Sequence, residues 1–284
     1  MDMTKREHYV PEFYLKRFTD NDGKVWVYDK KHKREYKSKP TNICVQNNLY
    51  ETEWTGDNKF NGKYLLQNKI ENEFKKYEKD FAESLRWLDK KVVSKKEQES
   101  IEIPERIRYQ VVCFITNLVH RNPKVMEKNN ISEINEKRIH KDRKATLSSL
   151  LDELEIGGCD SFIVSAQKQI FLLKEIGGPI DDWIKEIMEM PITFFYNKND
   201  MFITGDFPVI FGRETDGRYI YLPISSNSAI FISDHNVRLK NKLLVFDDKK
   251  TEKLNNFYVK YENDLIICKN NTQMERIKQM MGNN

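Results

Sequence analysis

A histidine near the start of the chain lies among side chains that could do chemistry. His8 is followed closely by Glu12, Tyr14 and Arg17. Because an imidazole titrates near neutral pH, His8 could exchange a proton with a substrate or bind a metal ion. A histidine packed against aromatic rings and hydrogen-bonded to backbone groups fits the same pattern, and composition alone favours that second interpretation.

An aspartate follows a hydrophobic run in the second half of the chain. Asp206 comes directly after Thr204-Gly205 and before Phe207-Pro208. A carboxylate at the end of a strand is rigidly placed yet lies outside the core, which suits a metal ligand or a general base. Aspartate in such a turn also commonly accepts hydrogen bonds from nearby backbone amides. The pattern fits both roles equally.

Two glutamates and one arginine complete the candidate chemistry. Glu71 and Glu78 are seven residues apart and each follows an apolar residue, so both could border one helix face. Four lysines between positions 69 and 79 favour ordinary solvated or ion-paired glutamates. Arg121 ends the next predicted helix, where the helix dipole favours a cation, and its forked guanidinium could bind a phosphate or a carboxylate.

Hydrophobic periodicity predicts the helices that would position these residues. A short helix starts at Pro11, and two longer ones cover residues 64–92 and the stretch from Pro104 to Asn122. The charged stretch 124–142 is an exposed helix or a connection. Further helical segments are predicted around residues 147–154, 161–176, 179–190 and 254–261.

β-prone runs flank this helical region on both sides. Residues 24–29 and 33–37 predict a hairpin around a turn. After residue 191 the period changes, and short apolar runs separated by Asn, Asp and Gly predict a mostly antiparallel sheet. Its strands are expected at residues 192–196, 201–204, 208–211, 219–222 and 229–232, with a last strand at 265–268 before a polar tail.

The order of these elements predicts an α+β protein. It would consist of a small N-terminal β-hairpin segment over residues 1–60, a helical middle over 61–190 and a C-terminal, mostly antiparallel sheet over 191–270. No linker rich in Pro, Gly or Ser interrupts the chain, so we expect a single composite domain over residues 1–284.

Composition narrows the classes of protein further. The 48 basic and 44 acidic residues give a net charge of +4, which permits a nucleic-acid partner without demanding one. No apolar run reaches the roughly 18 residues that span a bilayer. Residues 1–7 lack a secretory signal, so we expect a cytoplasmic protein without a membrane partner. The four dispersed cysteines predict buried free thiols, and phosphate-binding glycine loops, dinucleotide fingerprints and zinc-peptidase motifs are absent from the sequence.

The run His8-Tyr9-Val10-Pro11 resembles the N-terminal HYVP motif that marks a mostly bacterial family of unknown function. The family pattern commonly has serine where this chain has Gly205, which argues against a catalytic hydroxyl there but not against Asp206. The resemblance supplies no activity, yet it implies that His8, Arg121 and Asp206 are retained polar positions. Further matches follow in order at residues 47–50, at Glu71 and Glu78, and at residues 121–123, 202–208 and 223–225.

These residues predict a site where the helical middle meets the C-terminal sheet. His8, Glu71, Arg121 and Asp206 would be its catalytic groups, with Glu71 and Asp206 holding a divalent metal such as Mg²⁺ and Arg121 stabilising a phosphate. This chemistry fits a metal-dependent nuclease or nucleotide phosphodiesterase, and the family resemblance suggests a bacterial defence or toxin setting. The positions expected to contact a bound nucleic acid or nucleotide are Tyr14, Arg17, Asn47, Glu78 and Ser225.

The alternative is a non-catalytic module in which the same residues form a buried, hydrogen-bonded network that joins the two halves. Lysine-rich helices with aromatic residues between them would then contact a nucleic acid, a protein partner or a second copy of the chain. The two hypotheses differ in one observable. An enzyme needs His8 and Asp206 to face one pocket, whereas dry packing of either residue favours the network.

Overall fold

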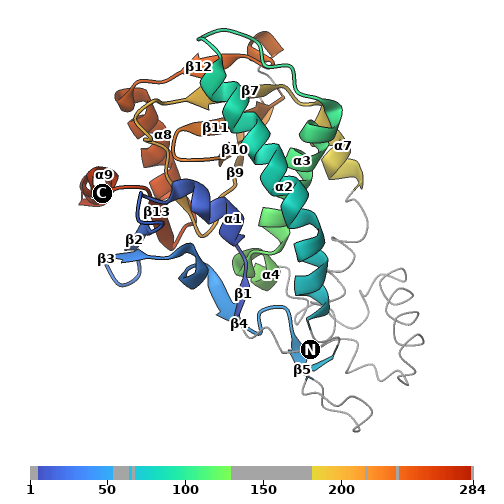
Figure 1. The fold of residues 1–284 in the computed structure, drawn as a ribbon, viewed down its shortest axis with the longest axis vertical. Helices are drawn as coiled ribbons and strands as arrows, with labels where there is room; N and C mark the ends of the chain where they lie inside the picture. The colour runs from blue at the N-terminus through green and yellow to red at the C-terminus, as the bar shows by residue number, and fades with distance from the viewer. Residues whose placement is uncertain are drawn as a thin grey trace.

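The computed structural model describes residues 6–53, 64–65, 68–128, 181–214, 217–234 and 237–282 (Figure 1). Helices and strands are mixed, with strands near the N-terminus, long helices in the middle and a mostly antiparallel sheet towards the C-terminus. The predicted α+β class is therefore confirmed. Within these ranges no helix has the length and apolarity needed to cross a bilayer.

The N-terminal segment consists of short strands and helical turns. β1 (Arg6–His8) pairs antiparallel with β4 (Val45–Asn47), and the helical turn α1 (Glu12–Leu15) begins directly after Pro11, as predicted. The predicted hairpin is also confirmed, because β2 (Val25–Asp29) pairs with β3 (Arg34–Ser38). Two 3₁₀ turns, η1 (Lys16–Phe18) and η2 (Pro40–Asn42), complete this segment.

The two longest helices are α2 (Lys69–Ser94) and α3 (Glu105–His120), with α4 (Pro123–Lys128) following directly. Helix α2 starts later than the predicted residue 64. Tyr64–Leu65 forms strand β6 instead and pairs with β5 (Thr52–Glu53), and Asn68 at the helix start has a left-handed φ of 59°. Most of the charged stretch and the segments predicted at 147–154 and 161–176 lie outside the described residues.

A five-stranded sheet lies at the centre of the fold, in the order β12-β7-β11-β10-β9. Its neighbours are antiparallel except for β12 and β7, which run parallel. The expected mostly antiparallel sheet is confirmed, and helix α7 (Asp181–Glu189) leads into it. The strands are β7 (Ile192–Tyr196), β9 (Ile210–Glu214), β10 (Gly217–Pro223), β11 (Ser228–Ser233) and β12 (Leu243–Val245), with the 3₁₀ turn η5 (Val237–Leu239) before β12.

A second sheet joins the two ends of the chain. In the order β3-β2-β13-β8, strand β2 of the N-terminal hairpin pairs with β13 (Leu265–Cys268), and β13 pairs on its other side with the two-residue strand β8 (Thr204–Gly205). The strand predicted at 201–204 is therefore wrong over its first three residues. The predicted polar tail is also wrong, because α9 (Asn271–Gly282) forms there and buries Met274 and Ile277.

Each face of the five-stranded sheet has its own hydrophobic core. Ile220 and Leu222 of β10 point into a core shared with α2, α3 and α7. Tyr221 points the other way, into a core shared with α8 (Asp248–Lys260) and the second sheet. Figure 1 shows α2 lying across the sheet beside α3. Cys44 and Cys268 are buried free thiols as predicted, Cys113 is a half-buried free thiol, and Cys159 lies outside the described residues.

Candidate functional site

Arg121 is the centre of a buried polar cluster at the end of α3. The residue has no exposed surface, although its side chain is charged and long. Its Nη1 donates to Glu78 Oε1 at 3.2 Å and to Asn117 Oδ1 at 3.4 Å, and its Nε donates to the Tyr50 hydroxyl at 3.3 Å. Nη2 donates to the backbone carbonyl of His8. All three guanidinium nitrogens therefore have partners within the protein.

The electrostatics of this cluster follow from its burial. Burial by itself would lower the pKa of Arg121, but the neighbouring Tyr50, Glu78 and Glu71 outweigh that effect and raise it. Glu71 is 7% exposed, and burial raises the pKa of its carboxyl despite Arg121 and Lys75 nearby. Its Oε2 is buried and has no hydrogen-bond partner among the described residues. Neutralisation of Glu71 by a proton is thus easier than for an exposed glutamate.

His8 reaches this cluster through its backbone rather than through its ring. Its carbonyl accepts from Arg121 and, at 3.1 Å, from the hydroxyl of Tyr50. The half-buried ring lies with Nε2 3.4 Å from the carbonyl oxygen of Pro40, and burial lowers its pKa. The neighbouring Glu7 accepts from the Tyr50 amide at 2.8 Å. The N-terminal strand is therefore bonded to Arg121 through His8, and to Tyr50 through both Glu7 and His8.

Asp206 belongs to a different junction, between β8 and β13. Its Oδ1 accepts from the amides of Asp264 at 2.9 Å and Leu265 at 3.1 Å, and its carbonyl accepts from Asn122 Nδ2 at 2.7 Å. The residue is 5% exposed, and burial raises the pKa of its carboxyl although the Leu265 amide and Lys124 act in the opposite direction. Asp206 thus accepts from backbone amides, as in the second predicted role, but these amides lie at the start of the distant strand β13 and not in its own turn.

Gly205 is tightly enclosed beside Asp206. A Cβ placed on Gly205 would lie 2.2 Å from Asn263 Oδ1 and 2.7 Å from the carbonyl oxygen of Leu265. The Asn263 side chain is itself needed there, because its Oδ1 accepts from the Phe207 amide at 2.8 Å. A serine, which the family resemblance leads us to expect here, has no space at this position.

A third polar cluster joins α1 and η1 to α2 and the central sheet. The hydroxyl of Tyr14 bonds to Thr204 Oγ1 at 2.8 Å and donates to the Pro223 carbonyl at 2.7 Å. Arg17 pairs with Asp89 of α2, and Ser225 donates to the other oxygen of Asp89 at 3.0 Å. Three predicted binding residues, Tyr14, Arg17 and Ser225, are thus largely enclosed by contacts within the chain.

The structure brings some of the predicted site residues together and separates others. His8, Glu71, Glu78 and Arg121 form one cluster, whereas Asp206 is linked to Arg121 only through the neighbouring residue Asn122. Tyr14, Arg17 and Ser225 form the third cluster, and Asn47 is exposed on β4. In the part of the chain that the structure describes, no three His, Cys, Asp or Glu side chains group closely enough to hold a metal ion. Glu71 and Asp206, the two predicted metal ligands, also belong to different clusters.

Sequence reasoning missed several partners that hold these clusters. Tyr50 contacts both Arg121 and His8, and Asp89 receives Arg17 and Ser225. Tyr50 closes the run 47–50 that matched the family pattern, so a signal for it was present. No signal in the sequence pointed to Asp89, because charged residues are frequent along α2. Only the folded chain shows which of them pairs with Arg17.

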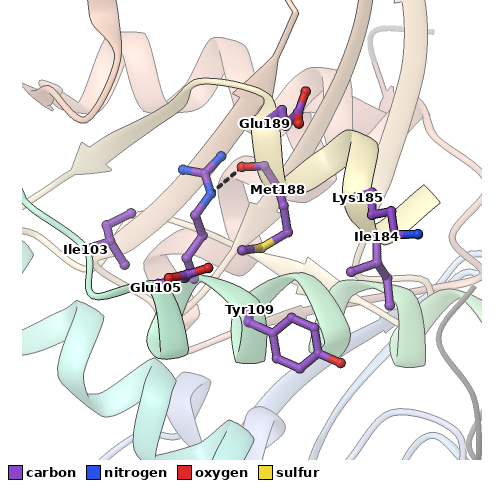
Figure 2. Close-up of a pocket in the computed structure, with 8 residues that line it drawn as sticks. Ile103, Glu105, Tyr109, Ile184, Lys185, Met188 and Glu189 are labelled. Carbon is purple, nitrogen blue, oxygen red and sulfur yellow. Dashed lines mark hydrogen bonds between the residues drawn. The ribbon is translucent and has the colours of Figure 1, made fainter. Parts of the chain in front are cut away.

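A pocket of about 540 Å³ opens elsewhere, between the start of α3 and α7. Arg108 Nε donates to the carbonyl of Met188 at 2.7 Å, and Figure 2 shows Met188 among the residues that line the pocket. Arg108 thereby caps the last turn of α7. None of the predicted site residues lines this pocket. Its lining residues are Ile103, Glu105, Arg108, Tyr109, Ile184, Lys185, Met188 and Glu189.

Residues 6–272 match the family described as "Protein of unknown function (DUF4238)". No curated protein and no solved structure matches the chain. The match covers all three polar clusters and adds no substrate, cofactor or partner to them.

Proposed function

Because the chain belongs to DUF4238, a family of unknown function, we propose its function from the geometry: it is a non-catalytic binding module whose parts are fixed together by buried polar residues. The observation that carries this proposal is Arg121. A phosphate-binding arginine needs free donors, whereas the guanidinium of Arg121 is fully buried and its nitrogens already bond within the chain.

The other two clusters support the same interpretation. Asp206 holds the start of β13 through two backbone amides, and Arg17 holds η1 against α2 through Asp89. Each cluster joins segments that are far apart in sequence. Buried networks of this kind stabilise one arrangement of the chain when their members are bonded, which suits a rigid scaffold for a nucleic acid or a protein partner.

The competing proposal is the metal-dependent nuclease or phosphodiesterase. One observation favours it, namely the buried Oε2 of Glu71 without a hydrogen-bond partner, beside a guanidinium. A perturbed carboxyl next to an arginine is a feature of catalytic sites. The proposal also needs Asp206 to act on the same substrate, and Asp206 lies in the separate junction with β13.

Two substitutions at one position distinguish the proposals. Asp206→Asn keeps an acceptor oxygen for the amides of Asp264 and Leu265, whereas Asp206→Ala leaves both amides without it. For a structural role, we expect Asp206→Asn to retain most of the stability and Asp206→Ala to lose about 1–3 kcal/mol of unfolding free energy. Both variants and the unmodified chain are compared by urea denaturation.

The same three proteins are then assayed for hydrolysis of single-stranded DNA, single-stranded RNA and a simple phosphodiester, with Mg²⁺ and with EDTA. The binding-module proposal expects no metal-dependent hydrolysis by any of them. Hydrolysis by the unmodified chain that is lost in a stably folded Asp206→Asn variant would overturn it in favour of the enzyme.

A further inference from the structure

One face of α8 carries lysines and a phenylalanine without any carboxylate. At 100° per residue, positions 249, 250, 253, 256, 257 and 260 fall within one third of the helix circumference. Lys253, Phe257 and Lys260 on this stripe are exposed, and Phe257 is 51% exposed. We call these six positions the α8 stripe; its members are Lys249, Lys250, Lys253, Asn256, Phe257 and Lys260.

The opposite face of α8 holds the helix in place. Thr251, Asn255 and Tyr258 are buried against the central sheet and the 201–207 segment, and Asn255 Nδ2 donates to the Met201 carbonyl at 2.7 Å. The acidic residues of α8 lie away from the stripe. Glu252 contacts Arg276 of α9, and Asp248 accepts from Asn199 at 2.9 Å. The stripe is thus a basic surface on a firmly anchored helix.

Aromatic rings continue from this stripe across the sheet. Phe257 lies 6.5 Å from Tyr219 of β10, which stacks on Phe231 of β11 at 5.7 Å. Phe231 stacks on Phe195 of β7 at 6.1 Å, and Phe195 stacks on Phe246 at 4.7 Å. Tyr219, Phe231 and Phe246 are only half-buried, so the row of rings reaches the surface beside α8.

Lysine side chains lie close to the aromatic rings at both ends of this row. The Nζ of Lys250 lies 6.0 Å from the centroid of the Phe246 ring, and Lys253 and Lys260 flank Phe257 on the helix. None of the four lysines of the stripe forms an ion pair with a described residue. A base stacks on an aromatic face whatever its identity, and a phosphate is attracted to unpaired lysines.

We propose that the α8 stripe and the adjoining row of rings bind single-stranded nucleic acid, with phosphates along the lysines and a base on Phe257. This inference rests on the proposed binding-module function and names its partner. A single strand fits better than a duplex because the bases of a duplex are already stacked on one another. The lysines extend over roughly 16 Å of helix, so several successive phosphates can be contacted.

The test uses the full chain and fluorescence anisotropy with labelled 20-nucleotide oligo(dT), oligo(U) and a duplex, over a series of salt concentrations. Substituting Lys253→Ala and Lys260→Ala together is expected to lower the slope of log K against log salt by about 1.4 for the single strands, since each phosphate contact contributes about 0.7. The matched control is Lys79→Ala with Lys90→Ala, the same charge change on exposed positions of α2. It should leave the slope unchanged.

Phe257→Ala tests stacking separately from charge. It is expected to weaken single-strand binding about fivefold or more without changing the salt slope, and Phe257→Trp should restore binding. Because the side chain is half exposed, circular dichroism and thermal unfolding should match the unmodified chain.

Three results would overturn the inference. The first is that the unmodified chain does not bind the oligonucleotides. The second is that the α2 control weakens binding as much as the lysine substitutions on the stripe. The third is that the duplex binds as tightly as the single strands and Phe257→Ala has no effect on binding. The surface could instead bind a second copy of the chain, and sedimentation of the same proteins tests this. If the unmodified chain is a dimer and Phe257→Ala is a monomer, the surface is a dimer interface. None of these results depends on Asp206, so the binding-module proposal is tested independently.

Discussion

The Arg121 cluster and the α8 stripe both contain basic side chains, yet these side chains are used in opposite ways. Arg121 has no exposed surface and donates to His8, Tyr50 and Glu78. The lysines of the stripe are exposed, and no described carboxylate pairs with them. One set of cations is used to join segments of the chain, and the other remains available to a ligand.

This difference shows why the type of a residue is a poor guide to its role. A hydrogen bond to a charged group contributes about 1.5–3 kcal/mol, and a ligand that took over Arg121 would have to replace several such bonds. A phosphate that approaches Lys253 displaces only water and counterions. Availability of donors, rather than their charge, separates the binding surface from the scaffold.

The largest loss of stability is expected from a substitution of Arg121. Arg121→Met removes the cation that compensates Glu78 and Glu71, and leaves the Tyr50 hydroxyl and the His8 carbonyl with fewer partners. Removal of one partner from a buried ion pair typically costs about 3–5 kcal/mol of unfolding free energy. Urea denaturation measures the loss, with an unchanged m-value required for the comparison.

The matched substitution on the α8 stripe is Lys253→Met, which we expect to change stability by less than about 0.5 kcal/mol. A similar, small change for Arg121→Met would show that the cluster does not hold the N-terminal strand to α3. The contrast between the two regions would then be lost.

A smaller effect is expected from Gly205→Ser, which places a side chain where Asn263 and the Leu265 carbonyl already lie. Overpacking of this kind costs about 1–3 kcal/mol. Gly282→Ser is the control, because no atom of the described part of the chain lies within 4 Å of its added Cβ. Thermal unfolding compares these two variants. The unmodified chain, Gly205→Ser, Asn263→Ala and the variant with both of these substitutions form a double-mutant cycle. Additive losses in the cycle would contradict a direct clash between the two side chains.

The sequence predicted the elements of this fold better than their associations. Helices α2 and α3 and most of the strands predicted after residue 191 have clear hydrophobic periods, and the structure confirms them apart from the start of α2 and residues 201–203. The pairing of β13 with β2 joins residues more than 230 positions apart, and no local pattern encodes it. Helix α9 was missed because its polar residues dominate, although Met274 and Ile277 are spaced as a helical face.

The candidate site shows the same limit. His8 and Arg121 were expected together and do meet, but the contact uses the carbonyl of His8 rather than its ring. A backbone contact has no signature in residue type. Asp206 was expected at a strand end and lies there, yet its oxygen is directed to the amides of Asp264 and Leu265, which only the pairing of β8 with β13 brings close.

The smallest effect on stability at neutral pH is expected from a substitution of His120, the neighbour of Arg121 at the end of α3. Burial lowers the pKa of His120 to about 4, and its ring lies 5.9 Å from Trp183. The unfolded chain protonates this histidine near its ordinary pKa of about 6.5 and so binds more protons than the folded chain below that pH. Stability should therefore fall between pH 6.5 and about 4, by less than about 1.4 kcal/mol per pH unit because burial is incomplete.

His120→Phe removes this titration while keeping an aromatic ring beside Trp183. We expect the difference in unfolding free energy between the variant and the unmodified chain to shift in favour of the variant as the pH falls from 6.5 to about 4. The raised pKa values of Glu71 and Asp206 act with the opposite sign, and they cancel in this difference because both proteins retain them. Lys260→Ala on the α8 stripe should follow the pH profile of the unmodified chain. A parallel profile for His120→Phe would place the acid sensitivity of the scaffold at another group.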